Sequence, residues 1–553
     1  MKPQAAIARA KNLLTAGRTK QVLGLLQTAR RDFPANAEIA LLLADALHAS
    51  AQLREAAEAY ETALLLNDRA ADGWYGLGCA QLALKAYGAA RNALARAAIL
   101  APDSAAVHYN LAKAQFELGS IEAAIENFER AALDPSMAQM ARGSIATIIP
   151  GSPAADNAAV LRARKTWARD EAAAPPPPAS RAAGAKTKIR IGYVSAFFGE
   201  RNWMKPVMAM VNHHDRARFE IHFFADGNPP APQSGYRDHD DDYVHDFRMV
   251  ENDRAAEIIR GIGIDVLVDL NGYGFPKRLP LMMQKPAPHL VGWFNMFATT
   301  GIEAFDWIVG DDSVLPGWEE KFYTEKIHRL PGSYLAFNIL YPVPDIAPPP
   351  SGVLGWVTFG CLGSQYKLTD AVIAAFARIL AGAPAARLFI KNGALKDAST
   401  RADLLRRLRE AGISETRVTL AGRSEHYDFL EAYGLVDIAL DTFPYNGGTT
   451  TTEALWQGVP VLSFDGDRWA SRTSKSLLLA AGLADWVMAD EAAFVARAIK
   501  LANDPETPSM LAALRHGMRA RLAASPVCDA AGLCTALEKF YEKISARPGA
   551  APE

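Results

Sequence analysis

The sequence predicts an α-helical repeat solenoid followed by two doubly wound α/β domains. Three observations support this fold class. The first 136 residues repeat with a period of 34, four consecutive prolines interrupt the chain at 175–178, and short β-rich runs alternate with candidate helices from residue 188 onward. We expect a repeat array over 1–136, a helical connector and proline-rich linker over 137–187, and α/β domains over 188–345 and 352–545.

Three columns of apolar residues carry the 34-residue period. Small residues let two antiparallel helices approach closely, and larger ones fill the space between neighbouring pairs, so each copy is predicted to be a helical hairpin. Stacked hairpins form a groove that usually binds a peptide or a partner protein, although the array could instead only dimerise or brace the chain. The columns are Val22, Ala56, Ala90 and Ala124; Leu26, Tyr60, Leu94 and Phe128; and Ala29, Ala63, Ala97 and Ala131.

Composition narrows the class of protein. Half of the 553 residues are hydrophobic and the formal net charge is −2, which indicates a globular, multidomain chain with no general field for nucleic acid. The four cysteines are scattered without CxxC spacing, so we expect neither disulfides nor a zinc site. No run approaches the roughly 18 apolar residues of a membrane span, and the N-terminus lacks a secretory core, so we expect a cytoplasmic protein without a membrane span.

Short β-rich runs predict the strands of the two α/β domains. Candidate helices such as 255–262 separate them, an alternation typical of parallel sheets, in which ligands bind beyond the carboxyl ends of the strands. A segment with five prolines, 341–351, is expected to form a hinge between the two domains. The expected strands are 189–194, 219–225 and 265–270 in the first domain, and 357–362, 386–391, 417–422, 436–442 and 459–464 in the second.

A glycine- and threonine-rich turn after the 436–442 run is the strongest single indication of a binding site. Gly447 and Gly448 permit a tight turn, and Thr449 and Thr450 begin a predicted helix whose N-terminus favours phosphate. The turn is neither a P-loop nor a Rossmann fingerprint. On physical grounds alone, it could equally be a capped structural turn.

Several longer stretches resemble one family. The run LDTFPYNGGTTTTEALWQGVPVLSFDGDRWASRTSKSLLLAAGL, together with IRIGYVSAFF, DVLVDLNGY, KPAPHLVGW, FYTEKIHRLPGSYL and FGCLGSQYKLTD, is similar to the O-linked N-acetylglucosamine transferase and SPINDLY family. That family joins tetratricopeptide repeats to a glycosyltransferase of the GT-B type. The resemblance implies a metal-independent, inverting transfer of a sugar from a nucleotide-sugar to Ser or Thr of a protein acceptor, without a cofactor.

The resemblance also implies roles for individual residues. Lys367 matches the family cation at the donor diphosphate, where a fixed positive charge would stabilise the departing nucleotide. Gly447, Gly448, Thr449 and Thr450 match the diphosphate turn, and Glu453 matches the acid that reaches the ribose. His426 lies near the position of another family histidine and is expected on the donor side.

The sequence departs from the family near the donor sugar and the acceptor. The segment Gly199 to Pro206 lacks both histidines of an HPxxH-like motif and carries Arg201, Asn202 and Lys205. We hypothesise that these cations select an acidic sugar such as a nonulosonic acid; the alternative is that both are solvated. A second altered loop, after Trp293-Phe294, contains Asn295, Thr299, Thr300 and Gly301.

Two functions follow from these patterns. The first is a protein O-glycosyltransferase, with flagellin as an acceptor suggested by analogy with bacterial enzymes of the same layout. The second is a non-catalytic tetratricopeptide scaffold with a degenerate transferase domain, motivated by the missing histidines. The general base stays open among Asp269, His289 and His426, each of which also has a structural interpretation. Asp311 and Asp312 are interpreted as a turn or helix cap rather than a metal site.

Overall fold

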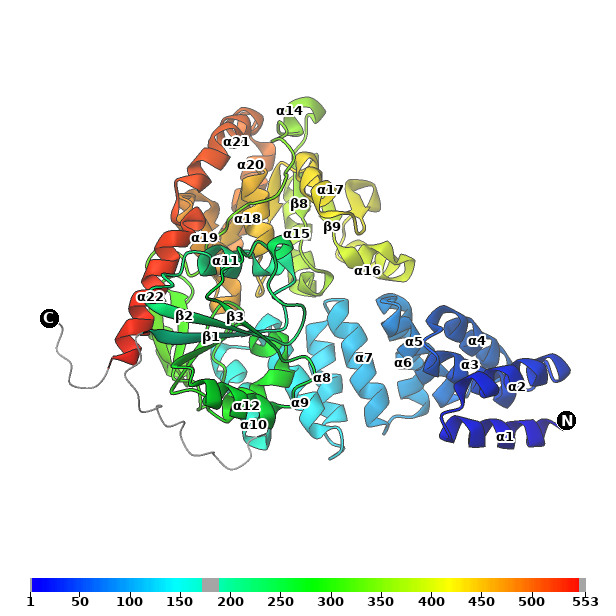
Figure 1. Cartoon of the computed structure of the whole chain (residues 1–553). Helices are drawn as coiled ribbons and strands as arrows, with labels where there is room; N and C mark the ends of the chain where they lie inside the picture. The colour runs from blue at the N-terminus through cyan, green and yellow to red at the C-terminus, as the bar shows by residue number, and fades with distance from the viewer. Residues whose placement is uncertain (1, 172–187, 547–553) are drawn as a thin grey trace.

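The computed structural model describes residues 2–171 and 188–546. It has a helical array followed by two parallel-sheet α/β domains, which confirms the predicted fold class (Figure 1). The proline run expected to form a linker lies outside the described residues. Within residues 2–171 and 188–546, no helix is both long enough and apolar enough to cross a bilayer.

Four helical hairpins form the array, and the three predicted columns lie on their second helices. All twelve column residues are buried, which confirms the hairpin prediction. A Cβ on Gly76 would lie 2.3 Å from the Tyr60 ring, and one on Gly78 would lie 2.4 Å from Leu94, so these glycines allow neighbouring helices to pack closely. The helices are α1 Pro3–Thr15, α2 Thr19–Asp32, α3 Ala37–Ala49, α4 Leu53–Leu66, α5 Ala71–Ala83, α6 Tyr87–Leu100, α7 Ala105–Glu117 and α8 Ile121–Ala131.

Two further helices, α9 (Ala138–Ile148) and α10 (Asn157–Glu171), continue the array as a packed pair. A hydrogen bond and an ion pair also attach the array to the second α/β domain. The Ser399 hydroxyl, in α16, accepts a hydrogen bond from the Ala89 amide at 2.9 Å, and Arg91 lies 2.5 Å from Asp403. Figure 1 shows the array projecting to one side of the two α/β domains.

The first sheet is entirely parallel, with strand order β3-β2-β1-β4-β5-β6-β7. Its expected strands are present, whereas β3, β5 and β7 were not expected because their runs are short or contain polar residues. Its helices are α11 Arg201–Val211, α12 Asn252–Ile262 and α13 Leu279–Met283; its strands are β1 Ile189–Ser195, β2 Phe219–Ala225, β3 Tyr243–Asp246, β4 Val266–Asp269, β5 His289–Gly292, β6 Trp307–Asp311 and β7 Lys326–Leu330.

The second sheet is also parallel, in the order β10-β9-β8-β11-β12-β13. Here β13 is the strand that sequence analysis missed, because it has only two residues. The strands are β8 Thr358–Cys361, β9 Arg387–Lys391, β10 Val418–Ala421, β11 Ile438–Leu440, β12 Val461–Phe464 and β13 Val487–Met488; the helices are α14 Ser351–Leu354, α15 Asp370–Gly382, α16 Ala398–Glu410, α17 His426–Glu431, α18 Thr449–Trp456, α19 Thr473–Ala480, α20 Glu491–Asn503, α21 Thr507–Ala523 and α22 Ala530–Ser545.

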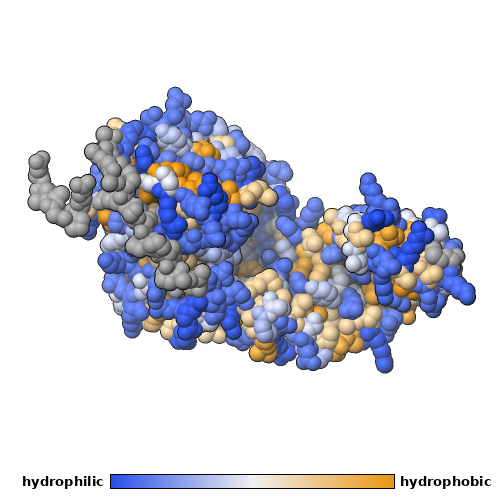
Figure 2. Space-filling view, turned by 60° about the horizontal axis from the view of Figure 1, so that its bottom comes forward, coloured by the Kyte–Doolittle hydropathy of each residue, from blue (hydrophilic) through white to orange (hydrophobic). Residues whose placement is uncertain are grey.

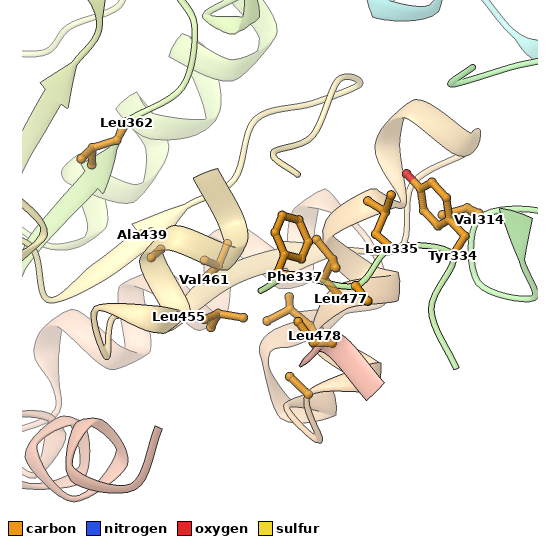
Figure 3. Packing of buried hydrophobic residues seen from close by; sticks show 14 of the residues in the cluster. Val314, Tyr334, Leu335, Phe337, Leu362, Ala439, Leu455, Val461, Leu477 and Leu478 are labelled. Atoms are coloured by element: carbon orange, nitrogen blue, oxygen red, sulfur yellow. The ribbon is translucent and has the colours of Figure 1, made fainter. Parts of the chain in front are cut away.

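Apolar contacts join the two α/β domains. After β7 the chain continues without helix or strand to α14, and Leu335 and Phe337 in this stretch belong to one buried cluster with Leu477 and Leu478 of α19 (Figure 3). At the other end of the chain, α22 returns to the first domain, where the Phe540 ring stacks on His328 at 4.0 Å. The two domains are therefore joined by apolar contacts at both of these places.

Candidate functional site

The glycine-rich turn is built around a buried carboxylate. Asp441 follows β11, and its Oδ1 accepts the Gly447 amide at 3.0 Å while its Oδ2 accepts the Ser463 hydroxyl at 2.6 Å. A Cβ on Gly447 would lie 2.6 Å from the Thr451 hydroxyl, so a larger residue there would displace that hydroxyl. Gly448 then caps α18, which begins at Thr449. The turn therefore presents the N-terminus of α18 at the carboxyl end of the sheet, an arrangement suited to an anion.

Lys367 lies beside this turn. It ends a short 3₁₀ segment, Gln365–Lys367, and its ammonium donates a hydrogen bond to the Asn446 carbonyl at 2.5 Å. It also lies 4.4 Å from the centroid of the Tyr445 ring. Burial lowers the pKa of Lys367 to about 8, an effect that the nearby Asp441 carboxylate opposes. The structure thus brings together the cation and the turn that sequence analysis assigned to the diphosphate.

A cavity of about 470 Å³ opens next to Lys367, between the end of the array and both α/β domains. Figure 2 shows the surface hollowed where the array meets the α/β domains. Aromatic side chains are numerous in the lining, and among the described residues that form it Glu200 is the only one with a carboxylate. The array and α10 contribute Phe116, Ile121, Thr147, Ile148, Pro150, Gly151 and Arg164; the first domain Phe197, Glu200, Trp203, Tyr273, Gly274, Asn295, Met296 and Phe297; and the second Tyr366, Lys367, Thr369, Phe443 and Tyr445.

A second group of expected residues meets across the domain interface. The Lys205 ammonium, from α11, lies 2.7 Å from Glu453 Oε1 of α18. His426 Nε2 lies 3.6 Å from the same oxygen, and its Nδ1 lies 3.1 Å from the Asn202 amide nitrogen. Arg201 is exposed and lies over the Tyr341 ring, 4.6 Å from its centroid. Glu453, expected on the ribose, is therefore paired with Lys205.

Burial shifts the pKa values of Glu453, Lys205 and His426. It raises the pKa of Glu453 and lowers that of Lys205, while their attraction opposes both changes. For His426, burial together with the positive charges of Lys205 and Arg201 lowers the pKa to about 4. The histidine is therefore neutral near pH 7 and can accept or donate a hydrogen bond through either ring nitrogen, according to its tautomer.

The second altered loop is held by groups outside it. The Thr299 hydroxyl donates to Glu325 at 2.7 Å, and the Thr300 amide donates to the other oxygen of that carboxylate at 2.5 Å. Arg164 of α10 donates to the Met296 and Thr299 carbonyls at 3.3 and 2.6 Å. Of the four expected loop residues, only Asn295 lines the cavity, and its amide donates to the Asn271 carbonyl at 2.8 Å.

The three candidates for the general base lie away from the cavity lining. Asp269 ends β4, where its carboxylate accepts the Asn271 and Gly272 amides, and burial raises its pKa to about 7. His289 is the first residue of β5, so it lies at the amino end of that strand, away from the carboxyl ends of the sheet. His426 belongs to the Glu453 group. Asp311 caps its own turn by accepting the Ser313 and Val314 amides.

Within the described residues, one group has the composition and spacing of a possible metal site. It consists of His214, Cys534 and Glu538, all buried between α22 and the first domain. His214 Nδ1 lies 2.9 Å from Glu538 Oε1, and the Asp215 amide donates to that same oxygen at 2.8 Å. Hydrogen bonds therefore already satisfy these groups, and none of the three residues lines the cavity.

Sequence analysis missed several residues of the site. Asp441 and Tyr445 lie inside the glycine-rich run, where a carboxylate following a buried strand and an aromatic residue before Asn446 were visible signals. Glu200 adjoins the altered histidine segment. For Phe116 and Arg164 no sequence signal existed, because their position depends on how the array docks against the α/β domains.

Models of two known families match parts of this chain. The family model described as glycosyl transferase family 41 matches residues 175–339 and 354–537, and a tetratricopeptide repeat model matches 49–104 and 87–138. A probable UDP-N-acetylglucosamine–peptide N-acetylglucosaminyltransferase SPINDLY from Petunia hybrida is 32% identical over 359 residues, covering 64% of this chain and 38% of the relative. The chain thus matches well under half the length of that relative.

A solved structure provides the fuller match. A mutant of the Thermobaculum terrenum O-GlcNAc transferase superposes with a TM-score of 0.77 at 27% identity, covering 93% of this chain and 98% of the other. The match includes the helical array as well as both α/β domains, since it extends over nearly the whole of each chain.

Proposed function

Because the chain belongs to glycosyl transferase family 41, we propose that it transfers a sugar from a nucleotide-sugar to a Ser or Thr hydroxyl of a protein. The observation that carries the proposal is the position of Lys367 beside the Gly447–Gly448 turn, at the cavity where both α/β domains and the array meet. A cation and a helix N-terminus at one point suit a diphosphate.

The proposed reaction is a single displacement. The acceptor hydroxyl oxygen forms a bond to the anomeric carbon as the bond to the nucleotide oxygen breaks, so the configuration inverts. Lys367 stabilises the negative charge that develops on the departing phosphate. The hydroxyl proton passes to Glu200, because the other titratable groups that the described residues contribute to the lining are cations or tyrosines.

Charge stabilisation by Lys367 and the helix leads us to propose a metal-independent reaction without a cofactor. Adding EDTA to a working assay is expected to leave the rate unchanged, and a large loss that Mg²⁺ or Mn²⁺ restores would contradict this.

The proposal extends to the sugar. Lys205 is neutralised by Glu453, so Arg201 is the exposed cation of the altered segment and the group available to an acidic sugar such as a nonulosonic acid. Binding measurements with UDP-, GDP- and CMP-sugars test this, and a clear preference for UDP-N-acetylglucosamine would refute it.

The acceptor is proposed to be a protein bound in the array groove, with flagellin as one example by analogy of layout. Intact masses of cellular proteins, compared with and without this protein, would report both transfer and the mass of the sugar. The alternative, a non-catalytic scaffold, predicts that Lys367→Ala leaves the cellular effect unchanged.

A further inference from the structure

The repeat array contacts the short segment that carries Lys367. The Phe116 ring, at the end of α7, stacks on Tyr366 with centroids 5.0 Å apart and an interplanar angle of 19°. Tyr366 directly precedes Lys367, and its ring meets Tyr445 edge-on at 6.2 Å. Since the Lys367 ammonium lies over Tyr445, a continuous row of rings leads from the array to the cation.

A second contact holds the residue that follows Lys367. Arg407 of α16 is 6% exposed and donates hydrogen bonds to the carbonyls of Leu118, in the array, and Leu368, directly after Lys367. Gly119 has a φ of +87°, and a Cβ there would lie 2.5 Å from the Leu368 carbonyl oxygen. The backbone of the array therefore approaches the lysine segment as closely as a glycine permits.

We propose that Phe116 is a positioning residue for Lys367, so that the repeat array forms a wall of the donor site as well as a surface for the acceptor. This inference rests on the proposed function. Stacking on Tyr366 keeps the segment in one conformation and keeps water away from the ammonium. Arg407 supports the same segment through its hydrogen bond to the Leu368 carbonyl.

The setting of Lys367 gives this role a measurable consequence. The Asp441 carboxylate favours the ammonium form of Lys367, Cys361 adds a smaller effect in the same direction, and Tyr445 lies beneath the ammonium, but burial outweighs these contacts and lowers the pKa of Lys367 to about 8. Removing the Phe116 ring admits water to the cavity wall, which reduces the desolvation cost. The pKa of Lys367 should then rise toward that of a solvated lysine.

The test is competitive acetylation of the full-length protein with acetic anhydride between about pH 6 and 11, with Lys367 followed by mass spectrometry of its peptide. We expect a titration midpoint near pH 8 in the wild type and at least about one pH unit higher in Phe116→Ala. Folding of each variant is checked by circular dichroism. If Phe116→Ala does not fold, the Lys367 midpoint is measured in Phe116→Leu, which removes the ring but keeps a larger side chain.

Tyr109→Ala is the matched control. Tyr109 lies on the same helix and loses a comparable ring, but its ring contact is with Phe128 inside the array, at 5.2 Å. In Tyr109→Ala, the titration midpoint of Lys367 should equal that of the wild type. The inference is overturned if a folded Phe116 variant has the same Lys367 titration midpoint as the wild type. It is also overturned if the midpoint shifts equally in Phe116→Ala and in Tyr109→Ala.

UDP binding by calorimetry separates this inference from the proposed function. We expect Phe116→Ala to weaken UDP several-fold at pH 7, while Tyr109→Ala binds like the wild type. Wild-type affinity retained in Phe116→Ala contradicts the positioning role only. If wild-type protein binds neither UDP nor GDP while the acetylation midpoint shifts as expected, the donor site fails but the contact between array and lysine stands.

Discussion

The Lys205 ammonium lies 2.7 Å from the Glu453 carboxylate, and the two side chains, 2% and 4% exposed, form a buried ion pair between the two α/β domains. Glu453 is the residue expected to meet the donor ribose, whereas Lys205 belongs to the altered segment that lacks the family histidines. The pair therefore connects the altered segment directly to the donor side of the interface. Its energetics should differ from those of an exposed ion pair because both charges have lost their hydration.

Removing one partner should destabilise the fold. Lys205→Met leaves the buried Glu453 carboxylate unpaired, and we expect the free energy of unfolding to fall by about 3–5 kcal/mol in urea denaturation. Because burial already raises the pKa of Glu453, the unpaired carboxyl would bind a proton more readily in the folded state than in the unfolded chain. The stability loss should therefore be larger at pH 8 than at pH 5.

Two further variants serve as controls. Replacing both partners by Met should recover most of the loss, since no buried charge remains. Lys11 and Glu38 form a pair of similar length whose side chains are 58% and 51% exposed. Lys11→Met should therefore cost less than about 1 kcal/mol. Equal effects of Lys11→Met and Lys205→Met would show that burial does not strengthen the pair.

Much of the fold could be predicted from the sequence, but the contact between Lys205 and Glu453 could not. Periodicity predicted the hairpins, because each column records one repeated packing contact, and the long β-rich runs predicted most of the sheet strands. The Lys367 segment and Gly447 turn are local motifs, so resemblance could identify both. The contacts of Lys205 with Glu453 and of Phe116 with Tyr366 join residues hundreds of positions apart, and no local pattern encodes such contacts.

Donor binding should depend on the protonation of Lys367. Its pKa of about 8 means that the ammonium is present below this pH and is lost as the pH rises through it. UDP affinity should therefore be constant between about pH 6 and 7 and then fall roughly tenfold per unit well above pH 8. In Lys367→Met this dependence should disappear, and affinity should be low throughout. A wild-type profile that is flat to pH 10 would contradict the role of the cation.

Glu200 should affect transfer rather than binding. Glu200→Gln keeps the size of the side chain but removes the proton acceptor, so we expect kcat to fall by about 10²–10⁴ while UDP affinity stays unchanged. Glu122→Gln changes another carboxylate, one in the array that does not line the cavity but accepts the Ser152 hydroxyl. It should leave kcat nearly unchanged. Activity that survives Glu200→Gln would assign the proton to another group, such as the donor phosphate.

The altered loop should tolerate only glycine at position 301. Gly301 has a φ of +68°, and a Cβ there would lie 2.7 Å from the Arg164 Cβ and 3.0 Å from the Lys165 backbone nitrogen. Gly301→Ala therefore adds about 1–2 kcal/mol of backbone strain and also pushes α10 away from the carbonyls that Arg164 binds. We expect lower stability in urea and a fall in kcat, because Asn295 on the same loop lines the cavity. Gly317→Ala, where no atom lies within 4 Å of the added carbon, should leave activity unchanged. If Gly301→Ala matches that control in both measurements, the contact between α10 and the loop does not support the site.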